Sequence, residues 1–141
     1  MSGGLTGHYH VIPTSAAIHE AEDLFPRFGD YQQARSHALK LRFWPVSDPN
    51  ESDQVVDLDW EWIKSMPGAK VGELRIDDVI GGCNNLRLIF YVSDLILPGD
   101  AMPKIWILSV LQKKSNSFTT HNLATFRGRL TILKKRVYEN H

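Results

Sequence analysis

Apolar and polar residues alternate along three short runs in the second half of the chain: Val71 to Ile76, Leu86 to Val92 and Ile105 to Leu111. A period of two is typical of strands that bury one face. Turn-forming residues separate the runs, at Gly81–Asn85 and at Pro98–Asp100. Because such short connections join neighbouring antiparallel strands, the pattern predicts a three-stranded β-meander.

The last part of the chain has a different period. Its apolar residues recur at intervals of three and four positions: Leu123, Phe126, Leu130, Leu133 and Val137. This spacing places them on one side of an α-helix. We therefore expect a helix from about residue 119 to residue 138, packed on the sheet.

The first half has weaker patterns. A short alternating run at residues 8–12 ends at Pro13 and predicts a strand. Thr14 or Ser15 suits the N-cap of a helix that reaches about residue 24. Helix-favouring residues at 31–43 predict a second helix, which ends before Pro45 because the residue before a proline disfavours the helical conformation.

Two further segments precede the meander. Residues 47–54 are polar and rich in turn formers, which predicts an exposed loop. Residues 55–66 carry apolar side chains at helical spacing and are followed by Pro67-Gly68, which predicts a third helix.

The expected fold is a single α+β domain over residues 1–141. Residues 1–69 would form an N-terminal strand and helices, and residues 70–141 the meander and the C-terminal helix. The expected sheet is antiparallel and has three to four strands.

Composition narrows the class of protein. The chain has 141 residues, of which 43% are hydrophobic and 23% charged, as in a globular domain. The single cysteine, Cys83, excludes an intrachain disulfide or a multi-cysteine zinc site, and we expect it to be structural. No run approaches the roughly 20 apolar residues of a membrane span, and Met1–Gly4 does not resemble a signal peptide. We expect a cytoplasmic protein with no membrane contact, metal or cofactor.

The charge is distributed unevenly, although the formal net charge is zero. Residues 1–103 hold eight Lys or Arg against fifteen Asp or Glu, whereas residues 104–141 hold eight against one. The basic end suggests a polyanionic partner such as nucleic acid, and the alternative is that the two halves neutralise each other across the fold.

Two arginines of the meander are candidates for phosphate binding. The alternation places Arg75 and Arg87 opposite the apolar faces of their strands, so both can lie on one surface of the sheet. A guanidinium fork matches the oxygens of a phosphate. The alternative is that each arginine is solvated or paired with an acidic residue such as Glu73 or Asp77.

More cations follow the third strand. Lys113 and Lys114 end it, and helical geometry places Arg127, Lys134 and Tyr138 on one flank of the final helix. We expect Lys113, Lys114, Arg127 and Tyr138 to border the same cleft as Arg87. Arg129 and Arg136 fall on the opposite flank, and His121 lies at the start of the helix. The alternative is that these residues provide solubility and, near the helix end, stabilise the helix dipole.

Four segments carry a family resemblance: Val71–Arg75, Asn85–Tyr91, Ile105–Ser115 and the basic helix that closes with Arg136-Val137-Tyr138. Their order and spacing resemble the RelE toxin superfamily, most closely its HigB-like, phage-derived branch. The resemblance covers about residues 70–140. It implies a RelE-like α+β fold. This chain departs from such toxins in its N-terminal part, which is longer and more acidic than is usual.

The resemblance also implies a function. It suggests the toxin of a type II toxin–antitoxin system, a metal-independent endoribonuclease that cleaves mRNA on the ribosome and is inhibited by a cognate antitoxin protein. In such enzymes the 2′-hydroxyl of the RNA attacks the adjacent phosphate, and cationic side chains stabilise the charge that develops. The resemblance implies these catalytic candidates: Arg75, Arg87, Lys113, Lys114 and Tyr138. The candidate RNA-binding residues are Arg127, Arg129, Lys134 and His121.

Two other functions remain open. A toxin of the same fold from the ParE branch would inhibit DNA gyrase and cleave no RNA. A catalytically inert binding module of the same fold would have its basic cleft covered by the acidic N-terminal extension.

Overall fold

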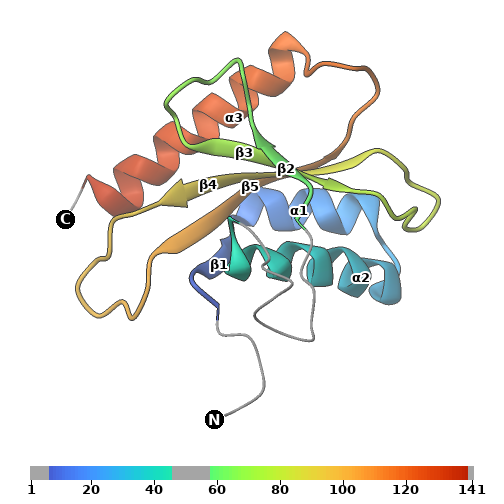
Figure 1. Cartoon of the computed structure of the whole chain (residues 1–141). Coiled ribbons are helices and arrows are strands. Elements are labelled where there is room, and N and C mark those ends of the chain that lie inside the picture. Colours follow the sequence, from blue (N-terminus) through green and yellow to red (C-terminus); the bar gives the residue numbers. More distant parts are fainter. Residues whose placement is uncertain (1–6, 46–57, 140–141) are drawn as a thin grey trace.

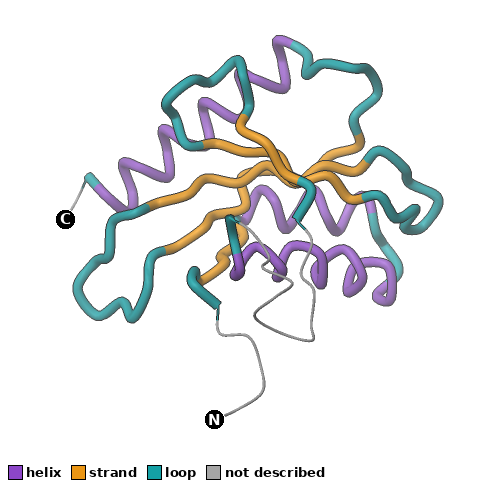
Figure 2. The backbone as a smooth tube through the Cα atoms, in the orientation of Figure 1, coloured by secondary structure: helices purple, strands orange, loops and turns teal. Residues whose placement is uncertain are grey.

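Over the part of the chain that the structure describes, helices and one five-stranded sheet form an α+β fold. The computed structural model describes residues 7–45 and 58–139. Figures 1 and 2 show helices on both faces of the sheet, with α1 and α2 on one side and α3 on the other. The strands are β1 (His10–Pro13), β2 (Trp60–Trp62), β3 (Val71–Ile76), β4 (Leu86–Ser93) and β5 (Lys104–Gln112). The helical segments are α1 (Ser15–Leu24), α2 (Phe28–Leu39), the 3₁₀ turn η1 (Lys40–Phe43), α3 (Thr120–Leu133) and the π turn η2 (Lys134–Tyr138).

The predicted meander is present. Strands β3, β4 and β5 pair in sequence and antiparallel. The sheet is larger than expected, however, because its order is β1-β5-β4-β3-β2, and it is mixed, because β1 pairs parallel to β5. The expectation of a purely antiparallel sheet is therefore wrong. Alternation within a strand indicates which side chains share a face, but it does not indicate the direction of the neighbouring strand.

The helix predicted for residues 55–66 is wrong over its described part. Residues Trp60–Trp62 pair with Gly72–Leu74 of β3 as the edge strand β2. Trp60 and Trp62 flank Glu61 in this strand, and both indoles contact the ring of Trp44. This aromatic packing with a distant residue outweighs the local helical spacing. Residues 55–57 and the predicted loop at 47–54 lie outside the described residues.

The other helices agree with the sequence. Thr14 caps α1, its side chain accepting a hydrogen bond from the amide of Ala17. Helix α2 begins at Phe28, three residues before the predicted start. Thr119 and Asn122 form a reciprocal capping box at the start of α3, whose last turn widens into the π turn η2.

Each face of the sheet has its own core. The core beneath α1 and α2 contains buried residues such as Leu41, Leu88 and Ile107, and the core beneath α3 contains Ile89 and Phe126. Because both faces are covered, the central strands are more continuously apolar than a half-exposed strand would be.

Phe90 occupies the centre of the larger core. It is fully buried, and its ring contacts Trp44 and Trp60. Gly72 lies opposite Phe90 on β3, and a Cβ at position 72 would come within 2.6 Å of that ring. Gly72 therefore leaves the space that the phenyl ring fills.

Candidate phosphate-binding site

The pairing of β3 with β4 positions the two arginines of the meander. Arg75 and Arg87 are direct cross-strand partners. Glu73 precedes Arg75 by two residues on β3 and therefore faces the same side of the sheet. The predicted placement of Arg75 and Arg87 on one surface is confirmed.

The start of β4 and the end of β5 complete a polar pocket. The amide of Lys113 donates a hydrogen bond of 2.8 Å to the carbonyl of Asn85, which holds these two chain ends together. Asn85 has φ +50°, a conformation that asparagine tolerates at a turn. The pocket encloses about 340 Å³ and is lined by Arg75, Asn85, Arg87, Lys113, Lys114, Ser115 and Asn116. Four of the five residues expected to be catalytic therefore share one concavity.

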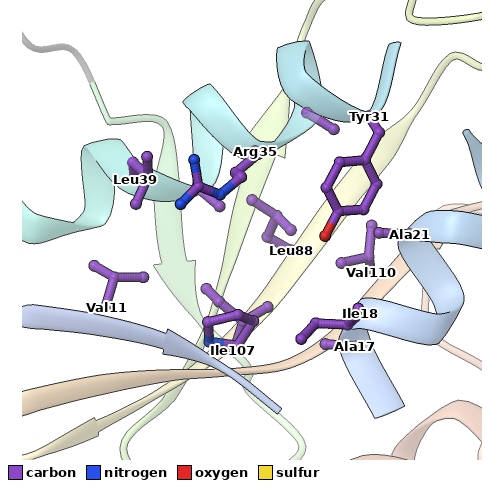
Figure 3. A pocket seen from close by; sticks show the side chains of 13 residues that line it. Val11, Ala17, Ile18, Ala21, Tyr31, Arg35, Leu39, Leu88, Ile107 and Val110 are labelled. Carbon is purple, nitrogen blue, oxygen red and sulfur yellow. The ribbon is translucent and has the colours of Figure 1, made fainter. Parts of the chain in front are cut away.

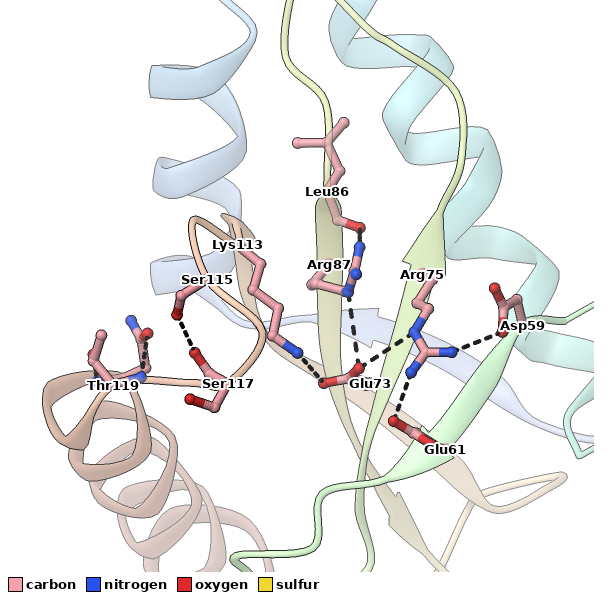
Figure 4. A network of polar contacts seen from close by, with 11 residues as sticks. Asp59, Glu61, Glu73, Arg75, Leu86, Arg87, Lys113, Ser115, Ser117 and Thr119 are labelled. Atoms are coloured by element: carbon pink, nitrogen blue, oxygen red, sulfur yellow. Dashed lines mark hydrogen bonds and ion pairs between the residues drawn. The ribbon is translucent and has the colours of Figure 1, made fainter.

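Glu73 lies beneath this pocket at the centre of the cations (Figure 4). The residue is only 3% exposed. Its Oε1 lies 3.6 Å from Nε of Arg75 and 3.8 Å from Nε of Arg87, and its Oε2 lies 3.8 Å from Nζ of Lys113. These distances agree with the alternative that the arginines are paired with an acidic residue. One buried carboxylate lies within salt-bridge distance of three cations.

Arg75 is the most extensively neutralised of these cations. Its guanidinium also contacts two carboxylates that precede or belong to β2, at 2.6 Å from Glu61 and 3.5 Å from Asp59 (Figure 4). Three acidic side chains around one guanidinium leave Arg75 little net attraction for a phosphate. We therefore assign the positive potential of the pocket mainly to Arg87, Lys113 and Lys114.

The loop between β5 and α3 forms the outer wall. Nζ of Lys113 lies 4.4 Å from the centre of the Phe118 ring, a cation–π contact that orients the ammonium group. The hydroxyl of Ser115 donates to the carbonyl of Ser117 and holds the loop compact. Lys114, by contrast, is exposed at the mouth of the pocket.

Tyr138 lies outside this pocket, contrary to the expectation. Its hydroxyl accepts a hydrogen bond of 2.8 Å from Nε1 of Trp106, and it lines a different pocket together with Lys134 and Tyr91. Helix α3 begins close to Lys113 but extends away from it. Because Tyr138 lies eighteen residues after the start of α3, it is displaced from that start by on the order of 25 Å along the helix axis.

Lys134 belongs to that second pocket as well. Its Nζ lies 5.5 Å from the centre of the Tyr91 ring, another cation–π contact. Burial raises the pKa of Tyr91, and the neighbouring Tyr138 raises it further, so the Tyr91 hydroxyl stays neutral at physiological pH.

The remaining predicted RNA-binding residues are dispersed. Arg127 donates to the carbonyl of Ser65. Arg129 pairs with Glu20 at 2.7 Å and donates to the carbonyl of Leu108, so it connects α3 to α1 and to the edge of β5. His121 is exposed. None of these side chains lines the pocket of Arg87, because each lies on a different side of α3.

An apolar cavity of about 120 Å³, which no sequence pattern indicated, lies between the helices α1 and α2 and the sheet (Figure 3). Four alanines of the two helices line it, with Tyr31 and Arg35 at its border. Its apolar wall suits neither phosphate nor RNA, so the pocket of Arg87 remains the candidate site.

The sequence patterns indicated only some of the residues at this site. Glu73 was considered only as an alternative ion-pair partner of the two arginines. Asn85 was considered only as a turn residue and Ser115 only as the end of the segment Ile105–Ser115, and Asn116 was not singled out. The alternation of β3 was a usable signal for Glu73, because it places that side chain two residues from Arg75 on the same face.

Known proteins offer no guide to this site. Comparison with protein families, with curated proteins and with solved structures finds no match to this chain. Over residues 7–45 and 58–139, no helix is long and apolar enough to cross a membrane. Within the same ranges, no three His, Cys, Asp or Glu side chains are grouped so that they could hold a metal ion.

Proposed function

We propose that this chain is a metal-independent endoribonuclease of the RelE/HigB-like type, the toxin of a toxin–antitoxin pair. One observation carries the proposal: Arg87, Lys113 and Lys114 meet at a single pocket large enough for a phosphodiester. Family resemblance adds mRNA on the ribosome as the substrate, a cognate antitoxin as the inhibitor and the cytoplasm as the location.

The reaction uses groups of the RNA itself. The 2′-oxygen forms a bond to the adjacent phosphorus as its proton passes to solvent water, and the bond from phosphorus to the 5′-oxygen breaks as that oxygen takes up a proton. The products are a 2′,3′-cyclic phosphate and a 5′-hydroxyl. Negative charge builds on the phosphoryl oxygens in the transition state, where fixed cations have their largest effect.

Each pocket cation has a role in this scheme. Arg87 and Lys113, each 3.8 Å from the Glu73 carboxylate, stabilise the phosphoryl oxygens. Lys114 is exposed at the mouth, where its ammonium group can donate a proton to the departing 5′-oxygen. Tyr138 lies in the other pocket and takes no part in the reaction.

The inert binding module is the second candidate. It is favoured by the pocket lining, which among the described residues includes neither His nor Tyr to accept the proton of the 2′-hydroxyl. Such a module would bind the RNA backbone through the same cations and release it unchanged.

A labelled RNA separates the two candidates. We expect the protein to cleave mRNA in the presence of EDTA and to leave a 2′,3′-cyclic phosphate on the upstream fragment. The same RNA should stay intact when a 2′-deoxynucleotide replaces the nucleotide before the cut. The assay is run with and without ribosomes. Cleavage that requires a divalent metal, or that proceeds at the 2′-deoxy position, would contradict the mechanism, and binding without cleavage would establish the inert module.

A further inference from the structure

The contacts of Glu73 are unusually loose for a buried carboxylate. Its distances to Arg75, Arg87 and Lys113 are 3.6, 3.8 and 3.8 Å, longer than a hydrogen bond. Oε1 of Glu73 and Nε of Arg87 are both buried, and neither has a hydrogen-bond partner among the described residues. Buried polar groups are nearly always hydrogen-bonded, so this pair calls for an explanation.

The cations around Glu73 need a common counter-charge. Arg75 and Arg87 lie directly opposite each other on adjacent strands, where like charges repel. Lys113 adds a third positive charge to the same carboxylate. Because Glu73 is buried beneath them, it can neutralise the repulsion without closing the outer side of the pocket.

A phosphate in the pocket would engage the same cations from outside. Arg87 has one amino group bonded to the carbonyl of Leu86, and its Nε is directed to Glu73 without forming a hydrogen bond. Lys113 is likewise held at a distance that leaves its donors available. The carboxylate and an incoming phosphate are therefore two anions that share one set of cations.

We propose that Glu73 is a positioning residue: an internal anion that fixes Arg87 and Lys113 for the reaction and, in doing so, weakens their attraction for the RNA phosphate. The proposal rests on the proposed function for its effect on rate. Its effect on binding is independent of any cleavage.

Glu73→Gln tests this with little change in shape, since no hydrogen bond to the carboxylate is lost. We expect this variant to bind a non-cleavable 2′-deoxy oligonucleotide about tenfold more tightly, because a negative charge within 4 Å of the phosphate-binding cations is removed. We also expect kcat on cleavable RNA to fall about 10²-fold, because Arg87 and Lys113 lose their fixed positions.

Two controls accompany the variant. Glu22→Gln makes the same change of net charge on the exposed side of α1, and we expect it to leave affinity and rate unchanged. Glu73→Asp retains the negative charge, so it should return the affinity to near that of the wild type and recover part of the rate. Should Glu73→Gln fail to fold, Glu73→Asp and NMR of the Arg87 Nε–H in the wild type, titrated with the same oligonucleotide, still test the proposal.

The outcomes are separable. A folded Glu73→Gln protein with unchanged affinity and rate, a loss of both together, or an Arg87 Nε–H resonance unaffected by the oligonucleotide would overturn the proposal. Tighter binding by Glu73→Gln, in a protein whose wild type cleaves no RNA, would support the competition between anions and refute the endoribonuclease.

Discussion

Arg87→Ala should lower the rate of RNA cleavage about 10³-fold. Arg87 lines the pocket from β4, the strand between β3, which carries Arg75, and β5, after whose end Lys113 lies. Loss of a single fixed donor to a developing oxyanion costs about 10²–10³ in rate, and here a full positive charge is lost as well. The measurement is single-turnover cleavage of labelled RNA in EDTA.

The matched control is Arg136→Ala, which removes an equal charge from an exposed position of the π turn η2, far from the pocket. We expect it to cleave at the wild-type rate. Arg87→Lys retains the charge but lacks the planar fork, so it should recover only part of the activity. Because Arg87→Ala also removes a partner of buried Glu73, its folding is checked by near-ultraviolet circular dichroism. A folded Arg87→Ala protein with full activity would exclude Arg87 from catalysis.

Phe90→Ala should lower the free energy of unfolding by about 3–5 kcal/mol, the usual cost of emptying a buried phenylalanine site. Phe90 is fully buried, and its ring fills the space left by Gly72 and contacts Trp44 and Trp60. Trp44 directly follows η1, and Trp60 belongs to the edge strand β2. The cavity left by the phenyl ring would therefore loosen the edge of the sheet. Urea unfolding followed by tryptophan fluorescence measures the change.

Phe28→Ala is the control for this experiment. Phe28 is 77% exposed at the start of α2, and we expect its removal to change the free energy of unfolding by less than about 0.5 kcal/mol. Similar effects of the two substitutions would show that Phe90 is not the centre of the core.

The parts of the fold that were predicted correctly depend on local periodicity. The alternation along β3, β4 and β5 gave their limits to within a residue or two, and it placed Arg75 and Arg87 on one face. The spacing of three and four residues in α3 gave both the helix and its buried side, including Phe126 and Leu130. Both signals follow directly from backbone geometry.

The errors arise where distant contacts decide the outcome. Trp60 and Trp62 form a strand because they pack against Trp44, which lies sixteen or more positions earlier in the chain. This error had a consequence for the site. A helix at residues 55–66 gave no reason to place Asp59 and Glu61 beside Arg75, and so the neutralisation of Arg75 was missed.

Tyr138 was misplaced for a different reason. A helical wheel gives the angle of a side chain around the axis, and it correctly assigned Tyr138 and Lys134 to one flank, where they share a pocket. It does not include the distance along the axis. The two pockets are separated by the length of α3 and by its direction relative to Lys113. Neither the length nor the direction follows from periodicity alone.

NMR mapping of the full chain with a non-cleavable 2′-deoxy oligonucleotide tests whether Arg87, Lys113 and Lys114 form one site for the RNA phosphate. We predict that the largest shifts occur at Asn85, Arg87 and residues 113–116, with little change at Tyr91 and Tyr138. Shifts centred on Tyr91 and Tyr138, or spread evenly over the exposed cations of α3, would contradict the account.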